Sequence, residues 1–202
     1  MENMPVVKEF IELAKLDCAS RHERLVVDAV TGKLKELGFT VREDGTAAKV
    51  EGEAGNVCAY LKGTAKGCVL FAAHLDRVQN GLGIKPQIKD GNLVSDGTTI
   101  LAADDLSGVA AILDGIRRAL ASGKPHPRIE VLFSVCEEIG VQGTKHLDTS
   151  LFEAKYGFVL DSPGRVGRVL DAAMGKAELF LDIKGKAAHA AYPELGVSAT
   201  HA

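Results

Sequence analysis

The 202-residue sequence contains no tryptophan, and aromatic residues make up only 5% of it. It has no run of five or more like charges, and its formal net charge is only -3. Proteins that bind nucleic acid without regard to sequence need clustered cations to displace counterions from phosphates, so we expect no nucleic-acid partner. No apolar stretch approaches the ~20 residues that span a bilayer, and we expect no membrane segment.

Cysteine is also sparse, and none of the four cysteines forms a C-x-x-C pair: Cys18, Cys58, Cys68 and Cys136. This spacing argues against a disulfide-stapled domain and against a thiolate zinc site, and it favours reduced thiols in a cytoplasmic protein. The first ten residues lack a basic segment followed by an apolar core, so no secretory signal is expected. With 46% hydrophobic and 25% charged residues, the composition is that of a globular protein with a sizeable core.

The apolar spacing predicts alternating helices and strands. Helices are predicted over residues 6–14, 17–37 and 104–120, and the second has Ser20 and Glu23 at capping-box spacing. Short apolar runs predict strands over residues 57–61, 68–73, 129–135 and 157–160. This alternation indicates an α/β fold with a mostly parallel sheet flanked by helices.

The pattern changes after Asp161. Leu179, Leu181 and Ile183 alternate with polar residues, which predicts a strand with one side in water. A helix is expected to begin after Pro193. We therefore expect a first domain over residues 1–165 and the beginning of an α+β domain over residues 166–202.

Polar residues that could bind a metal or take part in catalysis follow the predicted strands or precede a predicted helix: His74, Asp76, Asp104, Asp105, Glu137, Glu138 and Asp161. Taken singly, each fits a packing, capping or solvated residue. Together, one imidazole and several carboxylates at one sheet edge would repel one another unless a cation neutralised them. Imidazole and carboxylate without thiolate favour zinc, cobalt or manganese. Asp76, two residues after His74, is expected to hold the other imidazole nitrogen.

Five blocks in this order resemble the M20 metallopeptidases, most closely the peptidase T-like branch: Ala73–Asp76 (AHLD), Leu101–Asp105 (LAADD), Phe133–Gly140 (FSVCEEIG), Val159–Asp161 (VLD) and Gly185–Ala190 (GKAAHA). The resemblance runs from the helix near Ser20 to the end of the chain. It implies a zinc-exopeptidase-like catalytic domain over residues 1–165 and the start of a lid and dimerisation domain over residues 166–202.

The resemblance also implies site roles. Two divalent ions, zinc or alternatively cobalt or manganese, would be bound by His74, Asp104, Glu138 and Asp161, with Asp104 bridging them. Glu137 would be the general base, and Asp76 would support the site. His189, on the lid, would reach the active site of a neighbouring subunit, so a homodimer is expected. The implied activity is hydrolysis of peptide bonds in small peptides, of aminopeptidase or tripeptidase type.

The sequence departs from this family at Arg77 and Leu106, where Thr and Lys are common. The family's last metal-binding histidine lies in a C-terminal return to the catalytic domain, whereas this sequence ends within the lid segment. We therefore expect residues 1–202 alone to be a poor hydrolase. The alternatives are an M42-like aminopeptidase, an M20 deacylase of N-acyl amino acids, and an inactive truncated fragment or non-catalytic interaction protein.

Overall fold

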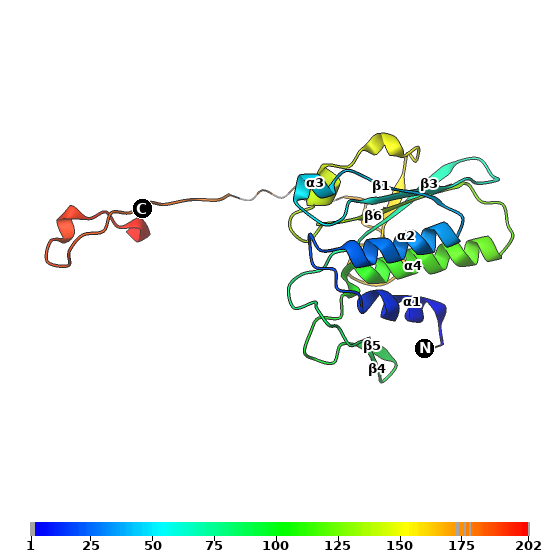
Figure 1. The fold of residues 1–202 in the computed structure, drawn as a ribbon, viewed down its shortest axis with the longest axis horizontal. Helices are drawn as coiled ribbons and strands as arrows, with labels where there is room; N and C mark the ends of the chain where they lie inside the picture. Colours follow the sequence, from blue (N-terminus) through cyan, green and yellow to red (C-terminus); the bar gives the residue numbers. More distant parts are fainter. Residues whose placement is uncertain (1–2, 173, 176, 178, 202) are drawn as a thin grey trace. The chain divides into compact units, whose positions relative to one another are not determined.

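The computed structural model describes residues 3–172, 174–175, 177 and 179–201 (Figure 1). The chain divides into two compact units, Met1–Pro163 and Gly164–Ala202. None of the helices in the described part of the chain has the length and apolar character needed to span a bilayer. All four cysteines lie in the described part and are free thiols.

The first unit is built on a five-stranded sheet. Its strand order is β1 (Thr40–Glu43), β2 (Val57–Leu61), β6 (Arg128–Ser134), β3 (Cys68–His74) and β7 (Gly157–Val159). The β6–β3 and β3–β7 pairs are parallel, whereas β1–β2 and β2–β6 are antiparallel. The α/β class is confirmed, and the sheet is mixed. The sequence does not predict strand β1, because the segment TVRE has a single apolar residue.

Helices α1 (Pro5–Ala14), α2 (Arg24–Glu36) and α4 (Ala103–Ala121) lie on one side of the sheet (Figure 1). Successive strand residues point to opposite faces, and the core follows that alternation. Val131 and Phe133 of β6 join the main core beneath the helices, while Leu132 packs in a smaller cluster on the other face. This two-sided burial explains why the central strands read as continuous apolar runs.

Shorter elements complete the two units. In the first they are α3 (Ala47–Val50), the hairpin β4 (Gln87–Lys89) and β5 (Asn92–Val94), α5 (Gln142–Lys145) and η1 (Thr149–Leu151). The second unit contains the 3-10 turns η2 (Pro193–Leu195) and η3 (Ala199–His201). A helix does begin at Pro193, close to the predicted position, but it lasts a single 3-10 turn.

Three local predictions are wrong. Residues 179–183 form no strand in the structure, and Leu179, Leu181 and Ile183 are exposed. Period-2 alternation yields a strand only where a second strand offers a hydrogen-bonding partner. The predicted start of the second helix is wrong as well: α2 begins at Arg24 rather than at residue 17. The capping box is absent, because the side chains of Ser20 and Glu23 have tertiary partners described below.

Candidate metal centre

The carboxyl ends of the three parallel strands gather the predicted site residues. His74 is the last residue of β3, Glu137 and Glu138 follow β6, and Asp161 follows β7. Asp104 lies in the first turn of α4. Parallel strands present their carboxyl ends at the same sheet edge, which is where α/β folds bind ligands.

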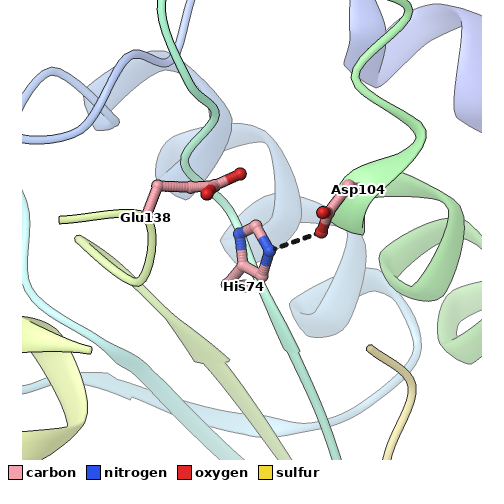
Figure 2. Close-up of side chains that lie close together, drawn as sticks. All are labelled: His74, Asp104 and Glu138. Atoms are coloured by element: carbon pink, nitrogen blue, oxygen red, sulfur yellow. Dashed lines mark hydrogen bonds and ion pairs between the residues drawn. The ribbon is translucent and has the colours of Figure 1, made fainter. Parts of the chain in front are cut away.

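His74, Asp104 and Glu138 form the first compact group. Figure 2 shows the carboxylates of Asp104 and Glu138 extending toward the imidazole of His74. His74 Nε2 lies 2.9 Å from Asp104 Oδ1. One ligand atom from each of the three side chains lies within 4.8 Å of the others, which is close enough for one ion to contact all three. The imidazole is 2% exposed and the Asp104 side chain 72% exposed, so the group opens toward solvent on the aspartate side.

A second group combines His74 with Asp105 and Asp161, again with ligand atoms within 4.8 Å of one another. Asp161 is a ligand predicted from the sequence, whereas the sequence predicts no separate role for Asp105. Asp105 is buried, and its Oδ2 accepts a hydrogen bond of 3.3 Å from the backbone N–H of His74. Gly108 makes room for it, because a Cβ there would overlap Asp105 Oδ1 and the Leu160 carbonyl oxygen.

Asp76 has more partners than the predicted contact with His74. The Nδ1 atom of His74 lies 2.9 Å from the backbone oxygen of Asp76 and 3.5 Å from its Oδ1. The Asp76 carboxylate also accepts hydrogen bonds from Ser20 Oγ at 2.6 Å and from the backbone N–H groups of Glu137 and Glu138 at 2.8 and 3.1 Å. Asp76 therefore orients both the imidazole and the glutamate pair.

The charges around His74 alter its proton affinity strongly. Burial of the ring disfavours the imidazolium, but hydrogen bonds to Asp76 and Asp104, together with the charges of neighbouring carboxylates, raise the pKa of His74 to about 10. Burial raises the pKa of Asp105 to about 8, and the charge of Asp161 acts in the same direction. The edge thus holds more negative charge than one imidazolium balances.

The remaining carboxylates show the same excess of negative charge. Burial, followed by the charges of neighbouring carboxylates, raises the pKa of Glu137, Glu138 and Asp161 above their usual values. A divalent cation would favour the ionised form of each of these groups. The donor set of one imidazole and several carboxylates is one that such cations bind.

A cavity of about 740 Å³ opens beside Glu138. Several polar side chains contribute to its lining, among them Ser20, Arg21, Asn80 and Gln142. Its volume lies within the range of small-molecule sites.

His189 lies in the second unit, apart from the other predicted site residues in the sequence. Its side chain is exposed, and its Nδ1 accepts a hydrogen bond of 3.1 Å from the Ala191 N–H. The loop that carries it is closed by a pair of backbone hydrogen bonds between Lys186 and Val197, each 2.9 Å long.

Sequence reasoning misses the supporting role of three residues: half-buried Ser20 and buried Glu23 and Asn56. Ser20 contacts Asp76, Glu23 contacts the backbone of Cys136, and Asn56 contacts the backbone of Val135. Their sequence spacing from the site is large, so no local pattern marks them. The only signal is the S-x-x-E spacing, which equally fits a capping box.

Comparisons with known proteins identify a matching family and similar proteins. Residues 56–197 match the profile of peptidase family M28. The protein YqjE of Bacillus subtilis is 40% identical over 196 residues, which cover 96% of this chain and 53% of YqjE. The crystal structure of aminopeptidase PepT from Bacillus cereus is 39% identical with a TM-score of 0.82, covering 98% of this chain and 54% of that one.

A tripeptidase structure from Staphylococcus aureus has a TM-score of 0.85 at 29% identity, covering 98% of this chain and 53% of that one. The chain spans about half the length of these relatives. These comparisons support a relationship to peptidase T, which the motifs also indicate. The matching family profile is that of M28, and it covers more than two thirds of the chain. The chain belongs to peptidase family M28.

Proposed function

We propose that this chain carries the metal-binding and water-activating residues of a metal-dependent peptidase that hydrolyses peptide bonds in small peptides. The observation that carries the proposal is the convergence of His74, Asp104 and Glu138, with ligand atoms within 4.8 Å, at the carboxyl edge of the sheet. The likeness to aminopeptidase PepT and to a tripeptidase supports the choice of reaction and substrate class.

The donor set fits two divalent ions, zinc in the first place and cobalt or manganese as alternatives. His74, Asp104, Glu138 and Asp161 would hold them. Two groups of donor atoms meet at His74, and the excess negative charge at this edge supports occupation by cations. Bound ions would supply Lewis acidity and lower the pKa of a water molecule.

Glu137 is the general base in this proposal. It is half-buried beside the donor groups, and its backbone is held by Asp76. Burial raises its pKa, which makes its carboxylate a better proton acceptor near neutral pH. Glu137 takes a proton from the attacking water as the oxygen–carbon bond forms, and returns it to the amine nitrogen as the carbon–nitrogen bond breaks.

The matching family profile is that of M28; for the arrangement of the active site, we infer the peptidase T-like M20 type. The five ordered blocks and the 39% identity to PepT support this finer assignment. Residues 1–165 would then be the first part of the catalytic domain, and residues 166–202 the start of the lid and dimerisation domain.

His189 would act from that lid on the active site of a partner subunit, where its imidazole could donate a hydrogen bond to the developing oxyanion. The test mixes full-length Glu137→Gln subunits with full-length His189→Ala subunits. Hybrids should recover part of the activity, because one of their two sites has both groups intact. Heterodimers without recovered activity would contradict action in trans.

The central test separates the two adjacent glutamates in a full-length protein. Glu137→Gln should abolish turnover of di- and tripeptides and retain metal, because the amide cannot accept the water proton while its shape is nearly unchanged. Glu138→Gln should lose metal. Elemental analysis and peptide hydrolysis measure both variants, and identical behaviour would overturn the assignment of base and ligand.

A further inference from the structure

The segment that carries both glutamates is held by side chains from distant parts of the chain. Strand β6 ends at Ser134, and the parallel ladder with β3 ends at the same residue. The next four residues, 135–138, have their backbone N–H groups directed to three buried side chains. The acceptors are Asn56 Oδ1 for residue 135 at 3.1 Å, Glu23 Oε1 for residue 136 at 3.0 Å, and Asp76 Oδ1 and Oδ2 for residues 137 and 138 at 2.8 and 3.1 Å.

Glu23 makes the contact with the least regular part of this segment. Cys136 has a φ of +54°, in the left-handed region that residues with side chains rarely adopt. Glu23 Oε1 accepts hydrogen bonds from the backbone N–H of Cys136 at 3.0 Å and from its thiol at 3.3 Å. It also accepts one from the backbone N–H of Arg21 at 3.0 Å. Glu23 is 0% exposed, so water does not replace these bonds.

The turn at Cys136 determines where the next two side chains point. A backbone that left the left-handed region at this residue would rotate the following peptide and move both glutamates. Asp76 holds the amides of Glu137 and Glu138 but makes no contact with Cys136 among those described. The hydrogen bond that Glu23 accepts is therefore the one that holds the Cys136 amide, at the turn itself.

We propose that Glu23 is a positioning residue, which fixes the turn at Cys136 and so places Glu137 and Glu138 for their separate roles. This inference rests on the proposed function, because it takes Glu138 as a metal ligand and Glu137 as the base. The hydrogen bonds of the Glu23 carboxylate are with Arg21 and Cys136 and not with the donor group around His74, so Glu23 acts through the backbone.

The test compares Glu23→Ala with a matched control in the 202-residue chain. Glu9 is also a buried glutamate, 6% exposed, but its partners are Lys33 and Arg117, away from the 135–138 segment. Glu9→Ala therefore reports the general cost of removing a buried carboxylate. Glu23→Gln, which keeps an acceptor oxygen for the Cys136 amide, is the conservative variant.

Two readouts are needed, the affinity for Co²⁺ from its visible absorption spectrum and the hydrogen exchange of single amides in the metal-free chain. Glu23→Ala should weaken Co²⁺ binding by about 10- to 100-fold, the usual effect of removing a group that supports a ligand. The amides of Cys136, Glu137 and Glu138 should exchange faster by a larger factor than those in the middle of α4, which report global opening. Glu9→Ala should change the Co²⁺ affinity by less than about threefold, and Glu23→Gln should recover part of the loss.

Equal effects of Glu23→Ala and Glu9→Ala on both readouts would overturn the proposal. If Glu23→Ala does not fold, Glu23→Asp, which withdraws the acceptor by one methylene, is compared with Glu9→Ala instead, with the same expected and contradicting results. A wild-type chain that binds no Co²⁺ would instead defeat the proposed function. The exchange of the Cys136 amide would still decide whether Glu23 holds the turn.

Discussion

The two halves of the sheet serve the same edge in different ways. In the parallel half, the carboxyl ends of β3, β6 and β7 lie at this edge: His74 ends β3, Glu137 and Glu138 follow β6, and Asp161 follows β7. In the antiparallel half, β2 runs in the opposite direction, so its amino end lies at that edge, with Val57 opposite Phe133 of β6. The parallel half thus supplies the side chains of ligand type, and the antiparallel half supplies one of the side chains that hold the segment after β6.

Asn56, directly before β2, is the main example of that support. Its Oδ1 accepts from the Val135 N–H at 3.1 Å, and its Nδ2 lies 2.9 Å from Asp44 Oδ2 and 3.0 Å from the Gly143 carbonyl oxygen. The contact with Gly143 depends on glycine, because a Cβ there would overlap the Val135 carbonyl oxygen. The antiparallel strand β2 therefore brings the amide-holding side chain of Asn56 to the segment after β6.

The largest expected effect on folding comes from Asp76, whose buried carboxylate accepts hydrogen bonds from Ser20 and from two backbone amides after β6. Asp76→Ala removes the acceptor from Ser20 and from the buried amides of Glu137 and Glu138. We expect it to lower the free energy of unfolding by about 3 to 5 kcal/mol. Urea denaturation measures the change. Asp28→Ala, which breaks only an exposed i,i+4 pair with Arg24, should cost about 0.5 kcal/mol or less.

Should Asp76→Ala be no more costly than Asp28→Ala, the buried carboxylate would not be what secures the segment after β6.

The antiparallel half is tested by Asn56→Ala. The variant leaves the Val135 N–H and the Gly143 carbonyl oxygen without this partner, and we expect a loss of about 2 to 3 kcal/mol in urea denaturation. Asn92→Ala is the control, since its exposed side chain has one hydrogen bond, to the Asp90 carbonyl oxygen. The main effect of Asn56→Ala should be on the free energy of unfolding, with a smaller effect on metal affinity. Substitution of a metal ligand should mainly lower metal affinity. Loss of metal without loss of stability in Asn56→Ala would break the comparison.

A third effect concerns the pH dependence of the metal-free chain. Burial raises the pKa of Asp105 to about 8, above its value in the unfolded chain, so the unfolded state loses this proton first as pH rises. The contribution of Asp105 therefore lowers the free energy of unfolding as the pH rises from about 4 to about 8, by at most about 1.4 kcal/mol per pH unit. Asp105→Asn mimics the protonated carboxyl and should flatten the stability profile in that window. A profile as steep as that of the wild type would rule out Asp105 as its source.

Much of the fold can be predicted because the central strands carry their own signal. The strand predicted over residues 57–61 forms at those bounds. The prediction for β3 differs from the structure by one residue at its carboxyl end, and that for β6 by one residue at each end. Strands that are apolar on both faces are buried on both faces, so the composition alone marks them. The placement of His74 and the Glu137–Glu138 pair at strand ends follows directly.

Other features depend on partners that sequence spacing does not reveal. Strand β1 has one apolar residue and is recognisable only through its pairing with β2. The Ser20–Glu23 spacing predicts a capping box, but tertiary contacts with Asp76 and Cys136 take both side chains. The roles of Asp105 and Asn56 escape prediction for the same reason, because each acts on a backbone amide 31 or 79 residues away.

Elemental analysis of the dialysed 202-residue chain tests the central claim most directly. The wild type is loaded with zinc, dialysed, and compared with the double variant His74→Ala, Asp104→Ala, which removes two of the three groups that converge at the edge. We predict that the wild type retains metal and that the double variant does not, while far-ultraviolet circular dichroism shows both folded. Equal metal content in two folded proteins would contradict a metal centre at this site.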